Sequence, residues 1–484
     1  MQPVQKKKRR KKKPWLVFIL LGIILAALTL LLILTTKPQD IPVVPDNTDE
    51  SLTLIQKNAD DLTRIEVFPS MGEGFTLIRS GDVFMVEGMP DFALEAREID
   101  LMVKDLSLLT AHEVMGQLDP GDTDSLSALG LGDDAARVWA IYRNGGRIGL
   151  AFGNTAATEI PADYLMLTGD NRVFTVSQET RAHFDRTLFT LHPVPALNFS
   201  SDLLDEAVFE GAGAFTLTLK EGLWELTSPG RYPADEAAVK AFLNNVNRMR
   251  LAVYAGEASE DNISLYGFAT ENRSVTFRLA KSAITAYDEE GLPLESRAVE
   301  AQDLTLSFGK EIDRIGFYIR YGDGIYQASL ASMGFLRNAA WAGLHARAPV
   351  NVPVNRLETL SAQKAAGTNT YAISLVESVL PNNQLELDMD GNRLYLPEII
   401  KNGTEMDRDA FLREYLKLMA LTASGSLPPD FEPDGDMAAR YRLTGAGIDL
   451  DIALYPFDAL HYAMRVNGIF ADYTDRQAAD AIQL

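Results

Sequence analysis

Residues 215–226 read FTLTLKEGLWEL, two runs of alternating apolar and polar residues on either side of Glu221 and Gly222. Alternation with a period of two predicts β-strands with one buried face, and a short interruption that contains glycine predicts a hairpin. Further along, apolar residues recur at helical offsets of 0, 3, 4, 7 and 10 from Val239 to Met249. The segment therefore predicts an antiparallel hairpin followed by a helix that packs one face against the sheet.

The same order of elements occurs earlier in the chain. Two apolar runs between Phe75 and Val86 flank a Ser-Gly-Asp turn, and the five helical offsets return in residues 99–109. Phe84 and Trp224 hold the same place in the two hairpins and lie 140 residues apart. This constant spacing indicates an internal repeat, in which Phe84 corresponds to Trp224.

A weaker copy is predicted towards the C-terminus. Residues 385–396 form another pair of apolar runs, and residues 461–470 resemble the closing hairpin that contains Gly324. Four of the helical offsets are kept, and they predict a buried face made of Leu412, Tyr415, Leu416 and Met419. The fifth offset falls on a polar residue, Thr422.

Two proline-marked joints, at 192–195 and 348–353, divide this repeating part of the chain. They predict three modules, at 51–192, 197–348 and 353–484, the last one degenerate. Each module is expected to combine antiparallel strands with a packed helix. The predicted fold class is therefore α+β, with an N-terminal transmembrane helix ahead of tandem repeated modules.

The N-terminus combines eight basic residues, Lys6–Lys13, with an uncharged apolar run, Trp15–Leu34. About 20 apolar residues are enough for a helix to cross a bilayer, and flanking positive charge stays on the cytoplasmic side. These residues predict a cytoplasmic basic leader at 1–14, a transmembrane helix at 15–36 and an extracytoplasmic linker at 37–50. The expected location is the cell membrane, with one span and most of the chain outside the cytoplasm.

A cleaved signal peptide is the alternative reading of the N-terminus. Its apolar region is usually about 7–15 residues long and ends in a small-residue cleavage site, which favours the uncleaved anchor here. The chain contains no cysteine, so a lipid-modified cysteine, a disulfide and a thiol nucleophile are excluded. Because an uncleaved anchor would stay in the membrane, the lipid bilayer is the first predicted partner.

The formal charge of −22 becomes −30 when the eight N-terminal positive charges are left out. Nucleic acids attract clusters of lysine and arginine, so this acidity argues against a nucleic-acid partner. An ordinary solvated surface explains the acidic residues, and attraction for cations or for a basic partner is the alternative.

Three segments of the second predicted module carry a specific order of motifs: Trp224-Glu-Leu-Thr-Ser-Pro, Pro233-Ala-Asp-Glu-Ala-Ala-Val239 and Leu265-Tyr-Gly-Phe268. This order resembles the domain of unknown function 4340, a family of bacterial envelope proteins with a basic N-terminus, one membrane span and tandem copies of the pattern. The first module departs from it, with Phe84 at the tryptophan position and Leu129-Gly130-Leu131 at the Tyr-Gly position. The third module lacks the Tyr-Gly element.

The resemblance implies a partner but no reaction, because no activity is established for this family. Its members are often encoded beside an ABC-type export system similar to one linked with gliding motility. The permease or the companion subunits of such a system are therefore the implied protein partners.

No catalytic, cofactor-binding or metal-ligating residue is predicted, and no cofactor. Neighbouring histidines are at least nine residues apart, whereas zinc sites usually include closer pairs. Asp388-Met-Asp390-Gly-Asn392 resembles the start of a calcium loop, but Arg393 and Ile399 stand where that loop needs its glycine and its distal glutamate. A hairpin turn explains the same residues. The five histidines, expected to be structural or surface residues, are His112, His183, His192, His345 and His461. Six strand aromatics are expected in the core or in an exposed interface row: Tyr142, Phe174, Tyr318, Tyr326, Phe470 and Tyr473.

These observations favour a membrane-anchored extracytoplasmic binding or scaffold protein without catalytic activity, accessory to an ABC-type envelope transport system. The alternative is a cell-envelope hydrolase that uses carboxylates in a cleft between modules. A deep cleft with two facing acids would favour the hydrolase, and a broad apolar surface patch would favour the scaffold.

Overall fold

The computed structural model describes residues 52–484 except for 120, 198–199, 288–292, 381–383 and 388–390. The predicted leader at 1–14, transmembrane helix at 15–36 and linker at 37–50 therefore lie outside the described residues. None of the helices in the described part of the chain is both long and apolar enough to cross a bilayer. The chain divides into two compact units, one ending at Leu191 and the other beginning at His192.

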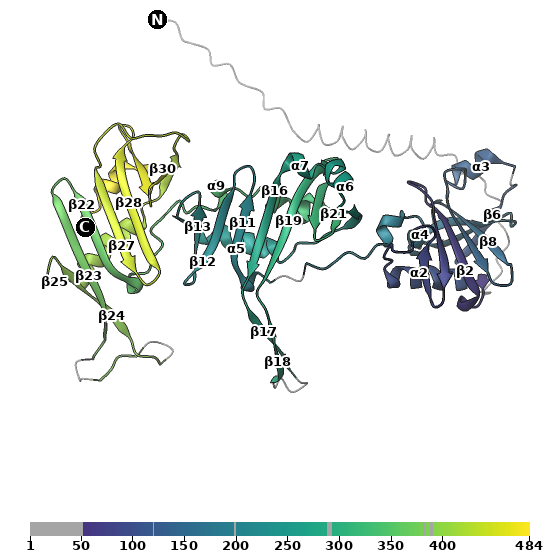
Figure 1. Ribbon diagram of the computed structural model, residues 1–484, viewed down its shortest axis with the longest axis horizontal. Helices are drawn as coiled ribbons and strands as arrows, with labels where there is room; N and C mark the ends of the chain where they lie inside the picture. The colour runs from purple at the N-terminus through teal and green to yellow at the C-terminus, as the bar shows by residue number, and fades with distance from the viewer. Residues whose placement is uncertain (1–51, 120, 198–199, 288–292, 381–383, 388–390) are drawn as a thin grey trace, which may run out of the picture. The chain divides into compact units, whose positions relative to one another are not determined.

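The first unit contains an eight-stranded antiparallel sheet in the order β4-β3-β2-β7-β8-β9-β10-β6 and a separate pair, β1 and β5. Helices α2 and α4 lie on one face of the large sheet (Figure 1). The strands are β1 (Leu52–Gln56), β2 (Leu62–Phe68), β3 (Phe75–Ser80), β4 (Val83–Val86), β5 (Leu108–Ala111), β6 (Glu113–Gln117), β7 (Ala136–Tyr142), β8 (Arg147–Thr155), β9 (Ala162–Leu167) and β10 (Arg172–Ser177). The α-helices are α2 (Ala96–Ser107), α3 (Thr123–Ala128) and α4 (Gln178–Phe184).

The second unit contains two nine-stranded antiparallel sheets, and the first has the order β14-β13-β12-β11-β16-β19-β20-β21-β15. The strands of this part are β11 (Leu204–Glu210), β12 (Phe215–Lys220), β13 (Leu223–Ser228), β14 (Tyr232–Pro233), β15 (Val253–Glu257), β16 (Arg273–Leu279), β17 (Ser282–Tyr287), β18 (Pro293–Val299), β19 (Gln302–Ile312), β20 (Gly316–Tyr321) and β21 (Gly324–Ser329). Its α-helices are α5 (Glu236–Val246), α6 (Glu260–Leu265), α7 (Phe268–Glu271), α8 (Leu330–Arg337) and α9 (Trp341–Leu344). Strands β17 and β18 pair with each other as a separate hairpin.

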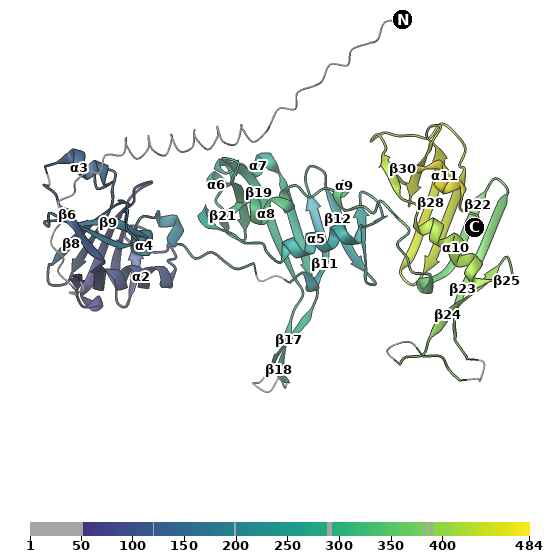
Figure 2. The same cartoon turned by 180° about the vertical axis from the view of Figure 1, so that it is seen from behind.

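The second sheet of this unit has the order β25-β24-β23-β22-β27-β28-β29-β30-β26. Its strands are β22 (Leu357–Lys364), β23 (Gly367–Glu377), β24 (Tyr395–Lys401), β25 (Thr404–Met406), β26 (Ala423–Ser426), β27 (Ala439–Gly445), β28 (Ile448–Pro456), β29 (His461–Val466) and β30 (Ile469–Asp475). The accompanying α-helices are α10 (Arg408–Met419) and α11 (Arg476–Asp480). Figure 2 shows these helices from the side on which they cover the strands.

The three large sheets follow one strand order, with an additional edge strand, β14 or β25, in the second unit. In each sheet a short helix starts directly after the strand that precedes the far edge strand. A side chain caps each of these helices by accepting a hydrogen bond from the backbone N–H three residues further on. The capping residues are Ser177, Ser329 and Asp475.

The predicted α+β class is wrong for the described residues, which do not include the predicted N-terminal transmembrane helix. The described residues form mainly antiparallel β-sheets, and their helices are short additions to them. Helix α2, which the periodicity predicted, buries three side chains: those of Ile99, Met102 and Leu106. Helical periodicity overestimates the share of helix in this fold. Each helix covers one face of a sheet, whereas strands make up most of the core.

The predicted buried face of the third helix is confirmed at Tyr415 and wrong at Leu416. In α10 the buried side chains are Phe411, Tyr415 and Leu418, whereas Leu416 is 60% exposed. Phe411 lies against the ring of Tyr371 on β23, with 5.3 Å between ring centroids. The Tyr415 hydroxyl donates a hydrogen bond of 2.7 Å to the carbonyl of Val352. These aromatic contacts turn the buried face away from Leu416.

The hairpin predicted at residues 385–396 forms only as an isolated antiparallel bridge between Leu387 and Arg393, and the extended pairing is a different one. Strand β24 pairs with β23, in a register that runs from Tyr371 opposite Lys401 to Glu377 opposite Tyr395. The described residues between these strands form isolated bridges. A search for local turns cannot find this pairing, because the residues 378–394 separate the two strands.

Candidate functional site

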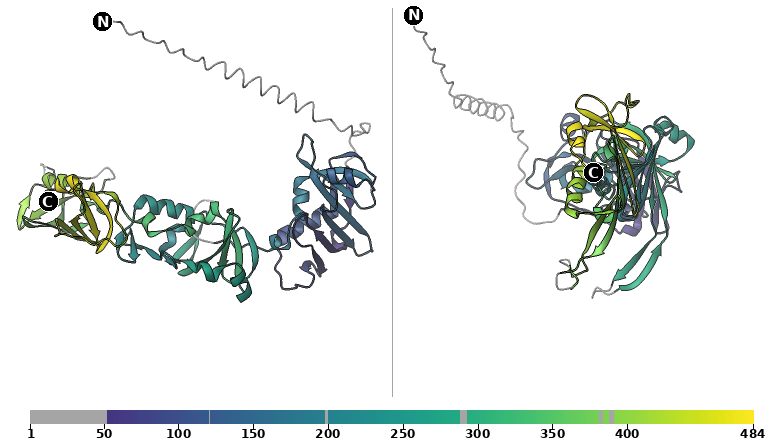
Figure 3. Two further views of the ribbon diagram at one scale, coloured as in Figure 1. Left: turned by 90° about the horizontal axis from the view of Figure 1, so that it is seen from above. Right: turned by 90° about the vertical axis from the view of Figure 1, so that its left-hand side faces the viewer.

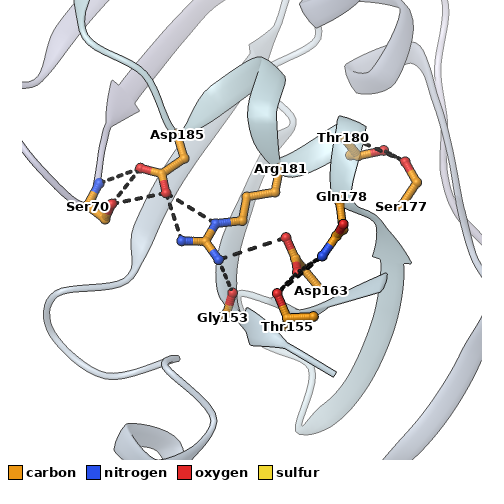
Figure 4. Close-up of polar contacts among 9 residues, drawn as sticks. All are labelled: Ser70, Gly153, Thr155, Asp163, Ser177, Gln178, Thr180, Arg181 and Asp185. Carbon is orange, nitrogen blue, oxygen red and sulfur yellow. Dashed lines mark hydrogen bonds and ion pairs between the residues drawn. The ribbon is translucent and has the colours of Figure 1, made fainter. Parts of the chain in front are cut away.

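A buried polar cluster in the first unit lies where α4 meets β8 and β9 (Figure 4). Asp163 on β9 is only 4% exposed. Its Oδ1 accepts a hydrogen bond of 2.9 Å from Thr155 Oγ1, and its Oδ2 lies 3.8 Å from an Arg181 nitrogen. A buried carboxylate requires such partners, because an unpaired buried charge is strongly destabilising.

Arg181 on α4 is the centre of this cluster. Its Nε and Nη2 donate to Asp185 Oδ2 at 3.1 and 2.9 Å, and its Nη1 donates to the carbonyl of Gly153 at 2.7 Å. Burial raises the pKa of Asp185, but hydrogen bonds from Ser70 and Arg181 outweigh it, so this pKa lies below its ordinary value. The charged atoms are thus used to attach α4 and the Ser70 segment to the sheet.

The corresponding helix of the second unit, α8, is held by a different set of charges. Arg337 lies 3.3 Å from Glu271 and 3.4 Å from Glu311, and its guanidinium lies over the ring of Phe317. An arginine attaches the helix in both units, but Arg181 follows its capping serine by four residues and Arg337 follows its own by eight, and their partners differ. This comparison favours a structural role for the Arg181 cluster, since a catalytic site would need particular groups.

The Tyr-Gly motif has a structural explanation in the backbone. Gly267 follows α6 with a φ of +77°, a conformation that favours glycine. The carbonyl of Tyr266 accepts a hydrogen bond of 2.8 Å from Lys310 N–H. A Cβ on Gly309 would lie 2.6 Å from that carbonyl oxygen. The two glycines therefore allow the α6 loop to lie against β19.

The same arrangement occurs in the first unit. Gly130 has a φ of +70°, and the carbonyl of Leu129 accepts a hydrogen bond of 2.7 Å from Asn154 N–H. Gly153 is too close to that carbonyl to carry a side chain. The departure from the Tyr-Gly sequence thus leaves the backbone contact intact.

A groove in the second unit is the best candidate for a binding site. It encloses about 500 Å³ between strand β13 and helix α5 on one side and residues 349–356 and the start of β28 on the other. Its main apolar lining residues are Leu223, Trp224, Val239, Leu243, Val352, Ile448 and Leu450. Trp224 and the Pro233 segment, which the sequence marked as motifs, thus share one cavity.

Charged residues surround this apolar lining. Arg231 Nε lies 2.7 Å from Glu225 Oε2, and Arg231 Nη1 lies 3.8 Å from Asp449 Oδ2. Glu236 Oε2 accepts a hydrogen bond of 3.4 Å from Asn351 Nδ2. The other basic residues of the lining are Lys220, Lys240 and Arg356. The groove therefore combines an apolar lining with a rim that carries both positive and negative charges.

Several contacts hold the two sides of the groove together. Arg356 Nη2 donates to the carbonyl of Glu221 at 2.9 Å, and the Glu221 side chain lies against Gly447. Nearby, buried His345 Nε2 and buried Asp472 Oδ2 are 2.7 Å apart. These contacts give a preformed groove, which is typical of ligand sites.

Four of the five histidines have a described structural contact. His183 lies 2.7 Å from Asp105, His192 Nδ1 lies 2.8 Å from the Pro193 carbonyl, and His461 Nδ1 lies 2.9 Å from Asp458 Oδ2. His345 has the contact with Asp472 given above. Among the described residues, no group of three or more His, Asp or Glu side chains could hold a metal ion.

None of the six strand aromatics considered as an interface row is exposed: Tyr142, Phe174, Tyr318, Tyr326, Phe470 and Tyr473 are buried or half-buried.

Sequence reasoning missed the groove, because Trp224 and Leu450 are far apart in the chain. The Trp and Pro-Ala-Asp motifs marked two segments that line the groove. Nothing in these motifs indicated that the two segments share a cavity.

Comparisons with known proteins give one match. Residues 224–443 match the family model described as Domain of unknown function (DUF4340). No curated protein and no solved structure matches the chain. The matched region begins at Trp224 in the groove and includes α5, the helix that forms part of the groove wall. Residues 224–443 therefore belong to the DUF4340 family.

Proposed function

We propose that this protein acts by binding, without catalysis, as an extracytoplasmic accessory subunit of an ABC-type, gliding-motility-like envelope transport system. The observation that carries the proposal is the preformed groove beside Trp224, with its apolar lining and charged rim. Such a surface suits an extended segment of a partner protein, whose apolar side chains would fill the groove while its polar groups meet the rim.

The contacts of the groove carboxylates support binding over hydrolysis. A glycoside hydrolase needs one carboxylic acid that carries a proton and a second carboxylate as base or nucleophile. In the groove, Glu225 and Asp449 share the guanidinium of Arg231. These ion pairs engage both carboxylates with one arginine, which favours a role in the charged rim of a binding surface.

The N-terminal sequence supports a position at the membrane. The basic run Lys6–Lys13 and the apolar run Trp15–Leu34 would attach the chain to the bilayer with residues 37–484 outside the cytoplasm. Attachment raises the effective concentration of the groove near a membrane partner. Fourteen linker residues, 37–50, span at most about 50 Å when extended, which is enough to reach a neighbouring permease.

Topology is tested with alkaline phosphatase fused after Glu50 and assayed in intact cells. Activity is expected, because the enzyme functions outside the cytoplasm. A well-expressed but inactive fusion would contradict the extracytoplasmic location.

The binding role is tested by crosslinking in native membranes, followed by purification of this protein and mass spectrometry. Permease or companion subunits should be recovered with the wild type, and recovery should fall several-fold with Trp224→Ala. Trp139→Ala is the matched control, because it removes a half-buried tryptophan from the first unit. Equal recovery with both variants would argue against the groove. Turnover of a cell-wall glycan by the purified protein would favour the hydrolase.

A further inference from the structure

Strands β23 and β24 extend beyond the body of their sheet as a two-stranded ribbon (Figures 1 and 3). Tyr371 and Ile373 are the last buried residues on β23, and every later residue of the strand is exposed. From here on, the ribbon contributes nothing to the apolar core of the sheet. We call residues 374–380, 384–387 and 391–398 the β23–β24 arm.

The described part of the arm has defined backbone contacts. Ser378 N–H donates to the Leu394 carbonyl at 2.8 Å, Leu394 N–H to the Glu386 carbonyl at 2.9 Å, and Glu386 N–H to the Ser378 carbonyl at 2.9 Å. Ser378 Oγ also donates to Glu386 Oε2 at 2.6 Å. This closed ring of hydrogen bonds joins three chain segments of the arm.

Large apolar side chains are concentrated on the arm, with exposed fractions between 39% and 55%. Leu375 and Val376 are adjacent on β23, so they point to opposite faces of the ribbon. Apolar surface of this extent usually marks an interaction site. The exposed apolar residues of the arm are Leu375, Val376, Val379, Leu380, Leu385, Leu387 and Tyr395.

The charges of the arm indicate what kind of partner covers it. Its described residues carry three carboxylates, from Glu377, Glu386 and Glu398, and one guanidinium, from Arg393. An anionic membrane surface would repel this net negative charge, and insertion into the bilayer core would bury the charged groups at high cost. A second copy of the arm would bring like charges together. A protein cleft with apolar walls would cover the exposed apolar side chains of the arm, and a basic rim would pair with its carboxylates.

We propose that the β23–β24 arm is a second docking element, inserted into an apolar cleft with a basic rim on a protein partner. Two apolar faces require a cleft, because a flat surface would cover only one of them. The inference rests on the proposed binding role but uses a surface other than the groove.

The absence of native cysteine permits a site-specific test in the full-length protein. Leu387→Cys, labelled with a cysteine-reactive photo-crosslinker in native membranes, should give one discrete protein adduct. Ile315→Cys is the matched control, because Ile315 is a 70% exposed apolar residue outside the arm. Peptide mapping should place the adduct in an apolar partner segment flanked by lysine or arginine. Adduct yield should fall at least fivefold in 1 M NaCl, since salt screens the rim charges.

A second variant separates this inference from the groove. Trp224→Ala should leave the Leu387→Cys adduct unchanged, whereas Val379→Asp should remove it without altering the thermal melt, because Val379 is 53% exposed. An adduct with lipid or with a second copy, equal labelling from Ile315→Cys, or no adduct would overturn the proposal. Loss of the adduct in Trp224→Ala would likewise assign binding to the groove and reject an independent arm site.

Discussion

The cluster around Arg181 in the first unit and the groove beside Arg231 in the second both place one guanidinium between two carboxylates. They differ in what surrounds the charges. Asp163 is 4% exposed and has partners from the sheet and from α4, whereas the side chain of Asp449 is 58% exposed at the edge of a cavity. The same set of charges therefore stabilises packing in one place and borders a binding surface in the other. Burial distinguishes the two roles, and residue type alone does not.

The largest effect is expected from a change inside the helix that forms one wall of the groove. Phe242 on α5 is 6% exposed and packs against Phe209 and Phe335, with ring centroids 6.1 and 5.7 Å apart. Phe242→Asp removes this packing and buries an unpaired charge, so it should destabilise the second unit by about 5 kcal/mol. Thermal melts followed by circular dichroism measure this loss.

Leu243→Asp is the matched control, because Leu243 is half-buried in the groove wall. It should destabilise the protein much less than Phe242→Asp and should still reduce partner recovery. Similar melts for Phe242→Asp and the wild type would contradict the packing of α5 described here.

Arg181→Met tests the internal role of the first-unit cluster. It leaves Asp163 and Asp185 without their shared guanidinium, and removal of one partner from a buried pair typically destabilises a protein by about 3 kcal/mol. Urea unfolding followed by circular dichroism should show this loss, while partner recovery per folded molecule stays unchanged. Arg181→Lys restores the charge but not the forked hydrogen bonds, so it should recover part of the stability. A wild-type unfolding midpoint for Arg181→Met would contradict the structural role.

Asp185 makes the stability of this cluster dependent on pH. Its folded-state pKa is lower than the ordinary value because the hydrogen bonds from Ser70 and Arg181 outweigh burial. The stabilisation is therefore present above the unfolded-state pKa and is lost as the pH falls through the folded-state pKa. Asp185→Asn should be less stable than the wild type at pH 7, and the difference should shrink below about pH 4. A difference that stays constant down to pH 2 would contradict this assignment.

Local patterns predicted some elements, and distant pairings explain why others were missed. The hairpins β3–β4 and β12–β13 were predicted because their strands alternate on either side of a short turn. The phase of α10 was mispredicted because Phe411 packs on Tyr371, a contact that helical spacing cannot reveal. The groove joins Trp224 to Leu450 and was not predicted, since no local pattern specifies which distant strands approach it.

Arg231→Met should give the smallest change in stability and completes the comparison with Arg181→Met. Arg231 has a side-chain exposure of 30%, and its second partner, Asp449, is 3.8 Å away and largely exposed. Pairs of this kind contribute about 1 kcal/mol or less. The urea midpoint should therefore shift only slightly, whereas partner recovery should fall, because the rim loses the charge that orients Glu225 and Asp449. Arg231→Lys should keep the charge and part of the binding. Arg231→Met could instead destabilise the protein as much as Arg181→Met and leave partner recovery at the wild-type level. Arg231 would then stabilise packing as Arg181 does, and the two regions would have the same role.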